Sequence, residues 1–157
     1  MIKKPNGYTG FMIKRLFFFK KKRIKFSGFQ TDTTYRLFKN GDVSYIEDKI
    51  VHEMPKIKGK TKLLKHNMLH YCFNSAAHYK SKIEHYATLK AEELHKKGKK
   101  ATIFHFIFRP FYKFMNNYFL RLGFLDGKEG FDLCYLNAYG VWYRYKILKR
   151  LQTLPKF

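Results

Sequence analysis

The sequence has few of the residues that build disulfide scaffolds, zinc sites or membrane spans. Its two cysteines, Cys72 and Cys134, are too few and too scattered for a disulfide framework or a zinc site, so we expect reduced, packed thiols. No window approaches the roughly 18 uncharged apolar residues that a spanning helix needs. The short apolar run at residues 16–19 is followed by lysines, which is not the pattern of a signal peptide.

Acidic residues are also scarce. Eleven Asp and Glu face 33 Lys and Arg among 157 residues, for a formal net charge of +22. Such an excess attracts polyanions, and nucleic acid, the anionic inner leaflet of a membrane and phosphorylated glycolipid are the candidate partners. Hydrophobic residues make up 45% of the chain and aromatic residues 19%, enough apolar surface to predict a folded domain rather than disorder.

The motifs of nucleotide-binding and nucleophilic enzymes are missing. The sequence contains neither Gly-x-Gly-x-x-Gly nor a phosphate loop. It has no Asp-x-Asp, the acid pair that holds a divalent metal against a sugar diphosphate, and no Ser/His/Asp or Cys/His set with supporting spacing. The residues that remain must therefore carry any functional prediction.

The first third of the chain is predicted to form strands. Basic and aromatic residues alternate at 14–19 and 23–26, on either side of a turn at Ser27-Gly28. Asn40-Gly41 is a strong hairpin signal, so we expect the segments at 33–38 and 43–46 to pair around it. A further extended segment is expected at residues 63–71.

From Asn74 onward the pattern becomes helical. Apolar residues recur at three- and four-residue steps on a first helix, with Asn74 or Ser75 as its cap and Gly98 at its end. The residues of that predicted face are Tyr79, Ile83, Tyr86, Leu89 or Lys90, and Leu94. A second helix is expected at 102–122, with a kink or a short break near residues 108–109 because of Pro110, and a third at 128–151.

These elements predict an α+β fold: a short hairpin and strand region, followed by about three helices of which the last two are amphipathic. We expect a first part at residues 1–73 and a helical, membrane-associating part at 74–157. The last two helices interleave aromatic residues with cations, as an in-plane membrane helix does, although core packing would produce the same pattern. The aromatic residues are Phe104, Phe106, Phe108, Phe111, Tyr112, Phe114, Phe119, Tyr135, Tyr139, Trp142, Tyr143 and Tyr145.

Asp32 is the first candidate for a chemical role. A lone carboxylate beside a turn is usually solvated or a cap, but an aspartate at a strand edge can also act as a general base. Arg36 is then either its salt-bridge partner or a phosphate ligand. His52-Glu53 and His70-Tyr71 are weaker patterns, which suit a metal or phosphate neighbourhood or an ordinary loop equally well. His66 and His70 are four apart, but outside a helix this spacing does not indicate zinc.

Residues 123–127, Gly-Phe-Leu-Asp-Gly, are predicted to form a corner between two helices. We expect Gly123 to adopt a left-handed conformation, Asp126 to cap the next helix and Gly127 to relieve crowding. A structural role is favoured over a catalytic one here.

Taken in order, these motifs resemble the C-terminal half of a bacterial family 2 glycosyltransferase of the lipopolysaccharide-core type, from about Lys4 to Leu151. The similar elements are Asn6-Gly7-Tyr8, residues 22–25 with Ser27-Gly28, Asp32 with residues 36–38, residues 51–53, Gly59-Lys60, His70-Tyr71, Tyr79 with Lys82 and Tyr86, Arg109-Pro110, residues 123–127, residues 136–141 and Arg144-Tyr145.

The resemblance implies a GT-A type domain that transfers a hexose from a nucleotide diphosphate sugar to a lipid-linked or lipopolysaccharide-core acceptor. The chain would then be cytoplasmic and peripheral on the inner face of the cytoplasmic membrane. Asp32 would correspond to the catalytic base, and Arg36, His52, Glu53 and His70 would be substrate-binding. A divalent metal, Mg or Mn, is implied for the family.

The sequence departs from the family pattern in lacking Asp-x-Asp and in having Lys21 where relatives tend to have glycine. We therefore expect a truncated gene product, a separately started fragment or one piece of a split enzyme, inactive alone, whose catalytic half is encoded upstream. The alternative is a small basic nucleic-acid-binding protein, in which aromatic residues stack on bases and cations neutralise phosphates. No recognised DNA- or RNA-binding motif supports that alternative.

Overall fold

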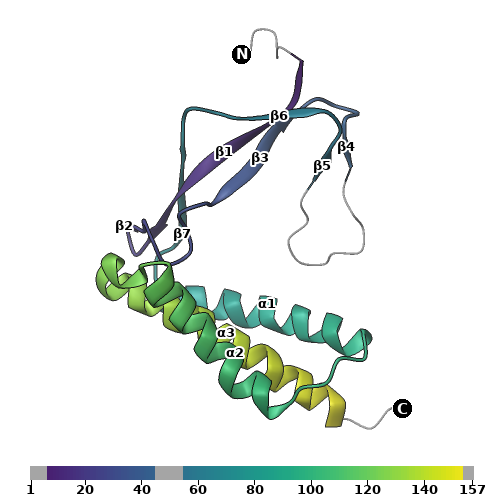
Figure 1. Cartoon of the computed structure of the whole chain (residues 1–157), viewed down its shortest axis with the longest axis vertical. Coiled ribbons are helices and arrows are strands. Elements are labelled where there is room, and N and C mark those ends of the chain that lie inside the picture. Colours follow the sequence, from purple (N-terminus) through teal and green to yellow (C-terminus); the bar gives the residue numbers. More distant parts are fainter. Residues whose placement is uncertain (1–6, 45–54, 154–157) are drawn as a thin grey trace. The chain divides into compact units, whose positions relative to one another are not determined.

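The computed structural model describes residues 7–44 and 55–153, and it confirms a mixed α+β fold. Figure 1 shows the strands and the three long helices. The strands are β1 (Tyr8–Phe19), β2 (Lys22–Arg23), β3 (Thr33–Phe38), β4 (Val43–Ser44), β5 (Lys56–Ile57), β6 (Lys60–Leu63) and β7 (Met68–Phe73). The helices are α1 (Ala76–Lys96), α2 (Ile103–Met115), the π-helix η1 (Asn116–Leu120), the 3-10 helix η2 (Gly123–Asp126) and α3 (Gly127–Thr153).

The chain divides into two compact units. One contains the residues up to Phe17 together with Thr31–His70, and the other contains Phe18–Gln30 together with the chain from Tyr71 onward. Residues 18–30 therefore group with the helices. The division expected between residues 73 and 74 concerns the roles of the two parts and stays a prediction.

In the strand unit, β1 is the common partner. It pairs antiparallel with β3, from Gly10 opposite Phe38 to Lys14 opposite Thr33, and parallel with β6. The hairpin expected between residues 33–38 and 43–46 is wrong, because β4 pairs with β5 instead. The turn itself forms: Gly41 has φ +88° and the amide of Asp42 donates to the carbonyl of Lys39. A tight turn thus does not ensure that its two flanks pair.

A second hairpin joins β1 to β2 in the helical unit, with Phe18 opposite Arg23 and Phe19 opposite Lys22. The two residues of its turn, Lys20 and Lys21, both have positive φ, 49° and 66°. Two consecutive left-handed residues are what a type I′ turn requires, and glycine or asparagine usually supplies them. This turn uses two lysines and carries the strain of their side chains.

Helix α1 has both expected caps. The Ser75 hydroxyl accepts a hydrogen bond from the amide of His78, and Gly98 ends the helix with φ +67°. The expected apolar face is partly wrong, since Tyr86 is exposed whereas Ala87 and Ala91 are buried. Small residues at these two positions let α1 approach α3 closely, so the alanines, not the larger tyrosine, mark the packed side.

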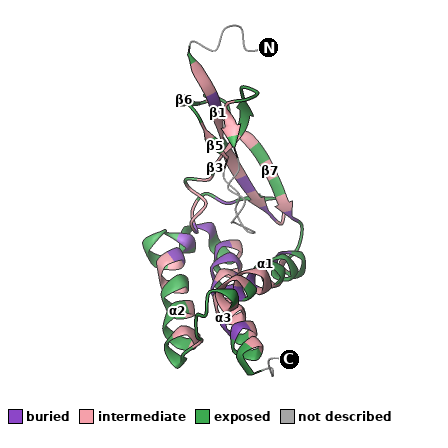
Figure 2. Cartoon of the chain, turned by 90° about the vertical axis from the view of Figure 1, so that its right-hand side faces the viewer, coloured by how far each residue is buried: buried purple, intermediate pink, exposed green. Residues whose placement is uncertain are grey.

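Helix α2 is continuous through Pro110, so of the kink or short break expected near residues 108–109 the break does not occur. The irregularity comes later, where the single expected helix ends as the π-helix η1. None of the residues of α2 is buried. Figure 2 shows α2 as exposed or half-buried along its length.

Helix α3 packs against both α1 and α2, which leaves it buried on more than one side. It keeps one exposed side, which carries Lys128, Lys146 and Arg150. Gly140 lies at the contact with α1, where a Cβ would come within 2.4 Å of Ile83 Cγ2. Gly130 is equally confined, since a Cβ there would lie 2.1 Å from the carbonyl oxygen of Gly123. The absence of a side chain at these two glycines therefore permits the close packing of this helix.

Candidate functional site

Asp32 lies just before β3 and is tied to Arg15 of β1 at two points. Arg15 Nη2 donates to Asp32 Oδ1 at 2.5 Å, and the amide of Arg15 donates to the carbonyl of Asp32 at 2.8 Å. Both side chains are partly buried, with 26% of Arg15 and 19% of Asp32 exposed. The guanidinium stabilises the charged carboxylate. Among the described residues, no hydrogen bond to Asp32 Oδ2 is present.

Of the two roles considered for Arg36, the salt bridge to Asp32 does not form, because Arg15 is the ion-pair partner of Asp32. Arg36 is exposed on β3, so its guanidinium remains available to an anion. The spacing of Asp32 and Arg36 along the chain pointed to the wrong arginine, since antiparallel pairing of β1 with β3 brings Lys14 opposite Thr33 and so places Arg15 beside Asp32. Only the pairing of the two strands could have identified Arg15.

Of the two candidate histidines, the structure describes only His70. His70 is half-buried on β7, with its ring centroid 6.2 Å from that of Phe17. His52 and Glu53 lie outside the described residues. Within residues 7–44 and 55–153, no group of three or more His, Cys, Asp and Glu side chains is placed to hold a metal ion. The metal that the resemblance implies therefore has no ligand set in the described part of the chain.

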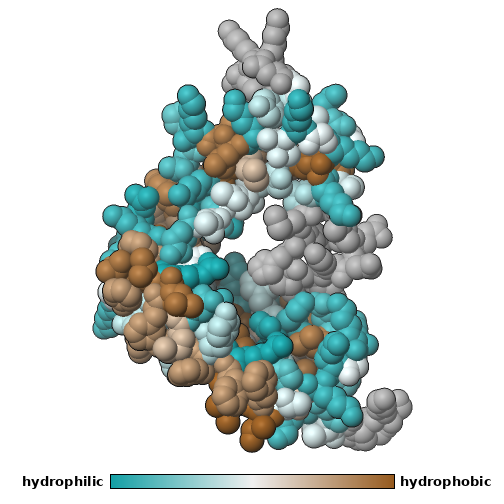
Figure 3. Space-filling model, viewed as in Figure 1, coloured by the Kyte–Doolittle hydropathy of each residue, from teal (hydrophilic) through white to brown (hydrophobic). Residues whose placement is uncertain are grey.

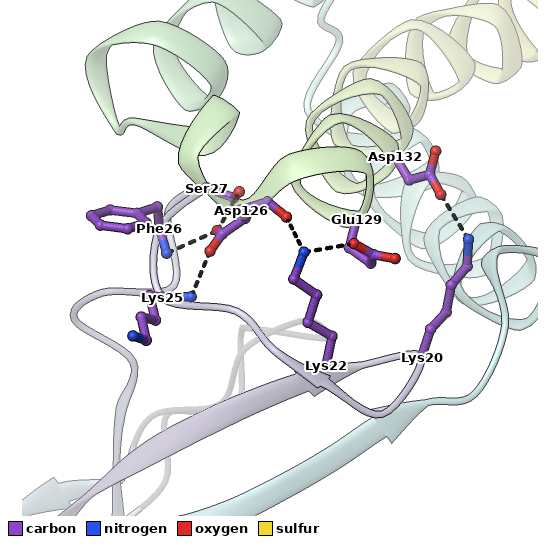
Figure 4. Close-up of polar contacts among 8 residues, drawn as sticks. All are labelled: Lys20, Lys22, Lys25, Phe26, Ser27, Asp126, Glu129 and Asp132. Atoms are coloured by element: carbon purple, nitrogen blue, oxygen red, sulfur yellow. Dashed lines mark hydrogen bonds and ion pairs between the residues drawn. The ribbon is translucent and has the colours of Figure 1, made fainter.

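In the helical unit, Asp126 is the best-connected acidic residue. It is only 4% exposed, at the end of η2. Its Oδ1 accepts a hydrogen bond from the amide of Lys25, and its Oδ2 accepts from the amide of Phe26 and the hydroxyl of Ser27, each at 2.9 Å. Figure 4 shows the three donors converging on this one carboxylate. Asp126 therefore fastens the segment at residues 25–27 to the start of α3.

Two ion pairs extend this fastening along α3 (Figure 4). Lys22 Nζ donates to Glu129 Oε2 at 2.9 Å and to the carbonyl of Asp126 at 2.8 Å. The hydrogen bond from Lys22 lowers the pKa of Glu129. Lys20 Nζ lies 2.7 Å from Asp132 Oδ2. These contacts join residues about one hundred positions apart in the sequence, which no local pattern indicates.

The corner at residues 123–127 forms between two helices, as expected, but the conformations and contacts of its individual residues differ from the expected ones. Leu122, not Gly123, adopts the left-handed conformation, with φ +56°. Gly123 is needed for space, because a Cβ there would lie 2.7 Å from the carbonyl oxygen of Asn117 and 2.8 Å from Cys134 Sγ. Asp126 binds residues 25–27 instead of serving only as a local cap. Gly127 has φ +66° and ψ −143°, a conformation that only glycine adopts readily.

The most prominent surface of the helical unit is apolar. We use the term α2 face for the exposed hydrophobic side chains of α2 and η1. Ile103 is 77% exposed, Phe111 62% and Leu120 76%. Figure 3 shows apolar surface gathered along the lower left and bottom of the view, where Figure 1 places α2. The other members of the α2 face are Phe104, Ile107, Phe108, Tyr112 and Phe119.

Behind this face, aromatic and cationic groups join α2 to α3. Arg109 Nη1 donates to the Tyr145 hydroxyl at 2.5 Å, and the His105 ring stacks on the Tyr145 ring with centroids 4.5 Å apart. The amide of Thr102 donates to His105 Nδ1. Burial, with a smaller contribution from Arg109, lowers the pKa of His105. The inner side of α2 is therefore fixed on α3 while its outer side stays exposed.

No helix among the described residues is long and apolar enough to cross a membrane. No known family model matches the chain. No solved structure matches it either.

Proposed function

We propose that this chain is the C-terminal portion of a family 2 glycosyltransferase of the lipopolysaccharide-core type. It would provide the acceptor side of an enzyme that moves a hexose from a nucleotide diphosphate sugar to a lipid-linked saccharide. The site for the donor diphosphate would lie outside this sequence, which has no Asp-x-Asp. The ordered motifs from residues 6–8 to residues 144–145 support this chemical class.

The observation that carries the proposal is the α2 face. A protein that acts on a lipid-linked acceptor must work at a membrane surface. Exposed aromatic and branched aliphatic side chains on a helix with no buried residue are suited to insertion among lipid headgroups and acyl chains. The net charge of +22 adds attraction to an anionic leaflet. We therefore propose a peripheral location on the cytoplasmic side of the membrane.

Asp32 is the proposed base that takes the proton of the acceptor hydroxyl. Arg15 would orient the carboxylate through Oδ1, while Oδ2 faces the acceptor. The exposed guanidinium of Arg36 would bind a phosphate of the substrate, as an arginine fork does. His70 and the undescribed His52 and Glu53 remain proposed substrate-binding residues on the strength of the resemblance alone.

The test is a transfer assay with the full chain, the product of the reading frame immediately upstream, nucleotide sugars and a lipid acceptor extract. Asp32→Asn should lower transfer by about a hundredfold or more, the usual contribution of a general base. Asp42→Asn is the matched control, because Asp42 belongs to the same unit and pairs only loosely, at 3.8 Å, with Lys39. Normal transfer by Asp32→Asn would disprove the base assignment. Absence of transfer with every donor and acceptor would disprove the proposed activity.

Binding measurements on the same protein also distinguish the proposed membrane-bound enzyme from the nucleic-acid-binding alternative. The α2 face contains branched aliphatic residues, which favour acyl chains over stacked bases. Binding to anionic vesicles with weak, strongly salt-dependent binding to RNA would agree with the proposal. Tight RNA binding without vesicle binding would replace it.

A further inference from the structure

A cavity of about 640 Å³ opens between the first turn of α2 and the last turns of α3. Its walls differ in character. Helix α2 contributes apolar side chains, and α3 contributes three cations. The principal lining residues are Ile103, Phe106, Ile107, Lys146, Lys149 and Arg150. The cavity therefore offers one apolar and one positively charged wall to a ligand.

The three cations are placed together by the helical repeat. Residues 146, 149 and 150 are three and four positions apart, so they share one side of α3. Lys146 Nζ lies 5.2 Å from the ring centroid of Trp142, and Lys149 Nζ lies 5.9 Å from that of Phe106. Aromatic rings thus position the ammonium groups of the two lysines among the three cations.

The positive charge of this wall is not neutralised by the described residues. Across residues 7–44 and 55–153, no carboxylate forms an ion pair with Lys146, Lys149 or Arg150, although seven other ion pairs are present. Three like charges around one opening repel one another, and an anion placed between them relieves that repulsion. A phosphate group, with several acceptor oxygens, matches three such donors.

The apolar wall is continuous with the α2 face. Ile103 and Ile107 line the cavity and are also exposed members of that face. A ligand held by its phosphate between the cations would therefore extend an apolar tail along the side that we propose to face the membrane. A free phosphate would use only the charged wall. The combination of both walls favours a phospholipid over an inorganic anion.

We propose that this cavity binds the phosphate of an anionic membrane phospholipid, with Lys146, Lys149 and Arg150 as its ligands and Ile103 and Ile107 against the start of its acyl chain. The inference rests on the proposed membrane location. It adds a defined lipid site to what would otherwise be general adsorption of a basic, amphipathic surface. Binding one lipid here would fix how α2 lies at the bilayer surface.

The first experiment measures vesicle binding by the full chain. A triple variant, Lys146→Gln, Lys149→Gln and Arg150→Gln, should bind phosphatidylglycerol-containing vesicles about a hundredfold more weakly, if each cation at the lipid surface contributes about fivefold. The control triple variant, Lys21→Gln, Lys25→Gln and Lys128→Gln, removes the same charge from exposed positions of the same unit and should lose less than about threefold. Equal losses in the two variants would overturn the lipid site.

A second variant separates failure of the site from failure of the membrane location. Phe108→Gln with Phe111→Gln alters the exposed α2 face without changing a buried residue or a residue that lines the cavity. If this variant loses vesicle binding while the cationic triple variant retains it, the cavity proposal is wrong and membrane docking stands. If the unaltered chain does not bind vesicles at all, both the membrane location and the lipid site are wrong.

The third measurement identifies the ligand. Trp142 is the only tryptophan of the chain and lies next to Lys146, so its fluorescence reports on the cavity. Soluble dihexanoylphosphatidylglycerol should produce a saturable change that the cationic triple variant abolishes. Absence of that change, or an equally tight response to inorganic phosphate, would overturn the phospholipid assignment. Loss of RNA binding in the triple variant without loss of vesicle binding would do the same.

Discussion

Replacing Asp126 by alanine should destabilise the helical unit more than any other single removal of an acidic side chain. The change leaves the amides of Lys25 and Phe26 and the hydroxyl of Ser27 without their buried acceptor. A hydrogen bond to a charged group contributes about 1.5–3 kcal/mol, and three bonds to one carboxylate are not additive. We therefore expect Asp126→Ala to lower the free energy of unfolding by about 3–5 kcal/mol.

Asparagine should give a smaller loss at the same position. Its amide oxygen can still accept from Phe26 and Ser27, but its NH₂ group then faces the amide of Lys25 and that bond is lost. The expected cost of Asp126→Asn is about 1–3 kcal/mol, mainly from the one unsatisfied donor. The free energy of unfolding should therefore increase from Asp126→Ala to Asp126→Asn to the unaltered chain, because each retains more of the three hydrogen bonds than the one before.

Urea denaturation followed by far-UV circular dichroism measures these differences. Asp132→Ala is the matched control, because Asp132 also joins α3 to the β1–β2 hairpin but does so through one partly exposed ion pair with Lys20. Such a pair contributes about 0–1 kcal/mol. If Asp126→Ala lost no more stability than Asp132→Ala, the three-donor arrangement would not be what secures residues 25–27, and the reasoning would be refuted.

Two further predictions concern local strain and pH. Lys21→Gly should raise the free energy of unfolding by about 1 kcal/mol in the same denaturation assay, since Lys21 holds φ +66° at a cost that glycine avoids; a loss of stability would contradict this account. The pKa of His105 is lowered below its ordinary 6.5 in the folded chain. The unfolded chain therefore binds more protons there, and the stability associated with His105 is present above pH 6.5 and lost as pH falls through the lower folded value. His105→Phe should reduce the loss of stability measured between neutral and mildly acidic pH, and an unchanged loss would exclude this histidine as its source.

The two proposals lead to one physical picture of the helical unit. Arg109, His105 and Tyr145 hold the inner side of α2 on α3, so α2 can present its apolar face without unfolding. The cationic wall at the end of α3 lies beside the beginning of that face. A membrane would then contact a preformed surface, so little ordering cost would accompany binding.

The sequence alone determined the helices because their signals are local. Ser75 and Gly98 bracket α1 as caps, and the third helix was expected within two residues of its observed ends. The corner at residues 123–127 was also recognisable, since glycine and a short acidic residue satisfy local backbone requirements. The α+β class followed from these elements and the strand-forming residues before them.

Tertiary structure decided which distant residues meet. Hydrophobic period and turn residues cannot indicate that β4 pairs with β5, that Arg15 rather than Arg36 contacts Asp32, or that Asp126 binds residues 25–27. The same limit applies to α2 and α3, whose aromatic residues look alike in sequence. Helix α3 contacts both α1 and α2 and buries Tyr145, although its Phe131 and Tyr135 are exposed, whereas no residue of α2 is buried. Burial depends on what packs against a residue, and that is settled by the whole fold and not by the residue's neighbours in the chain.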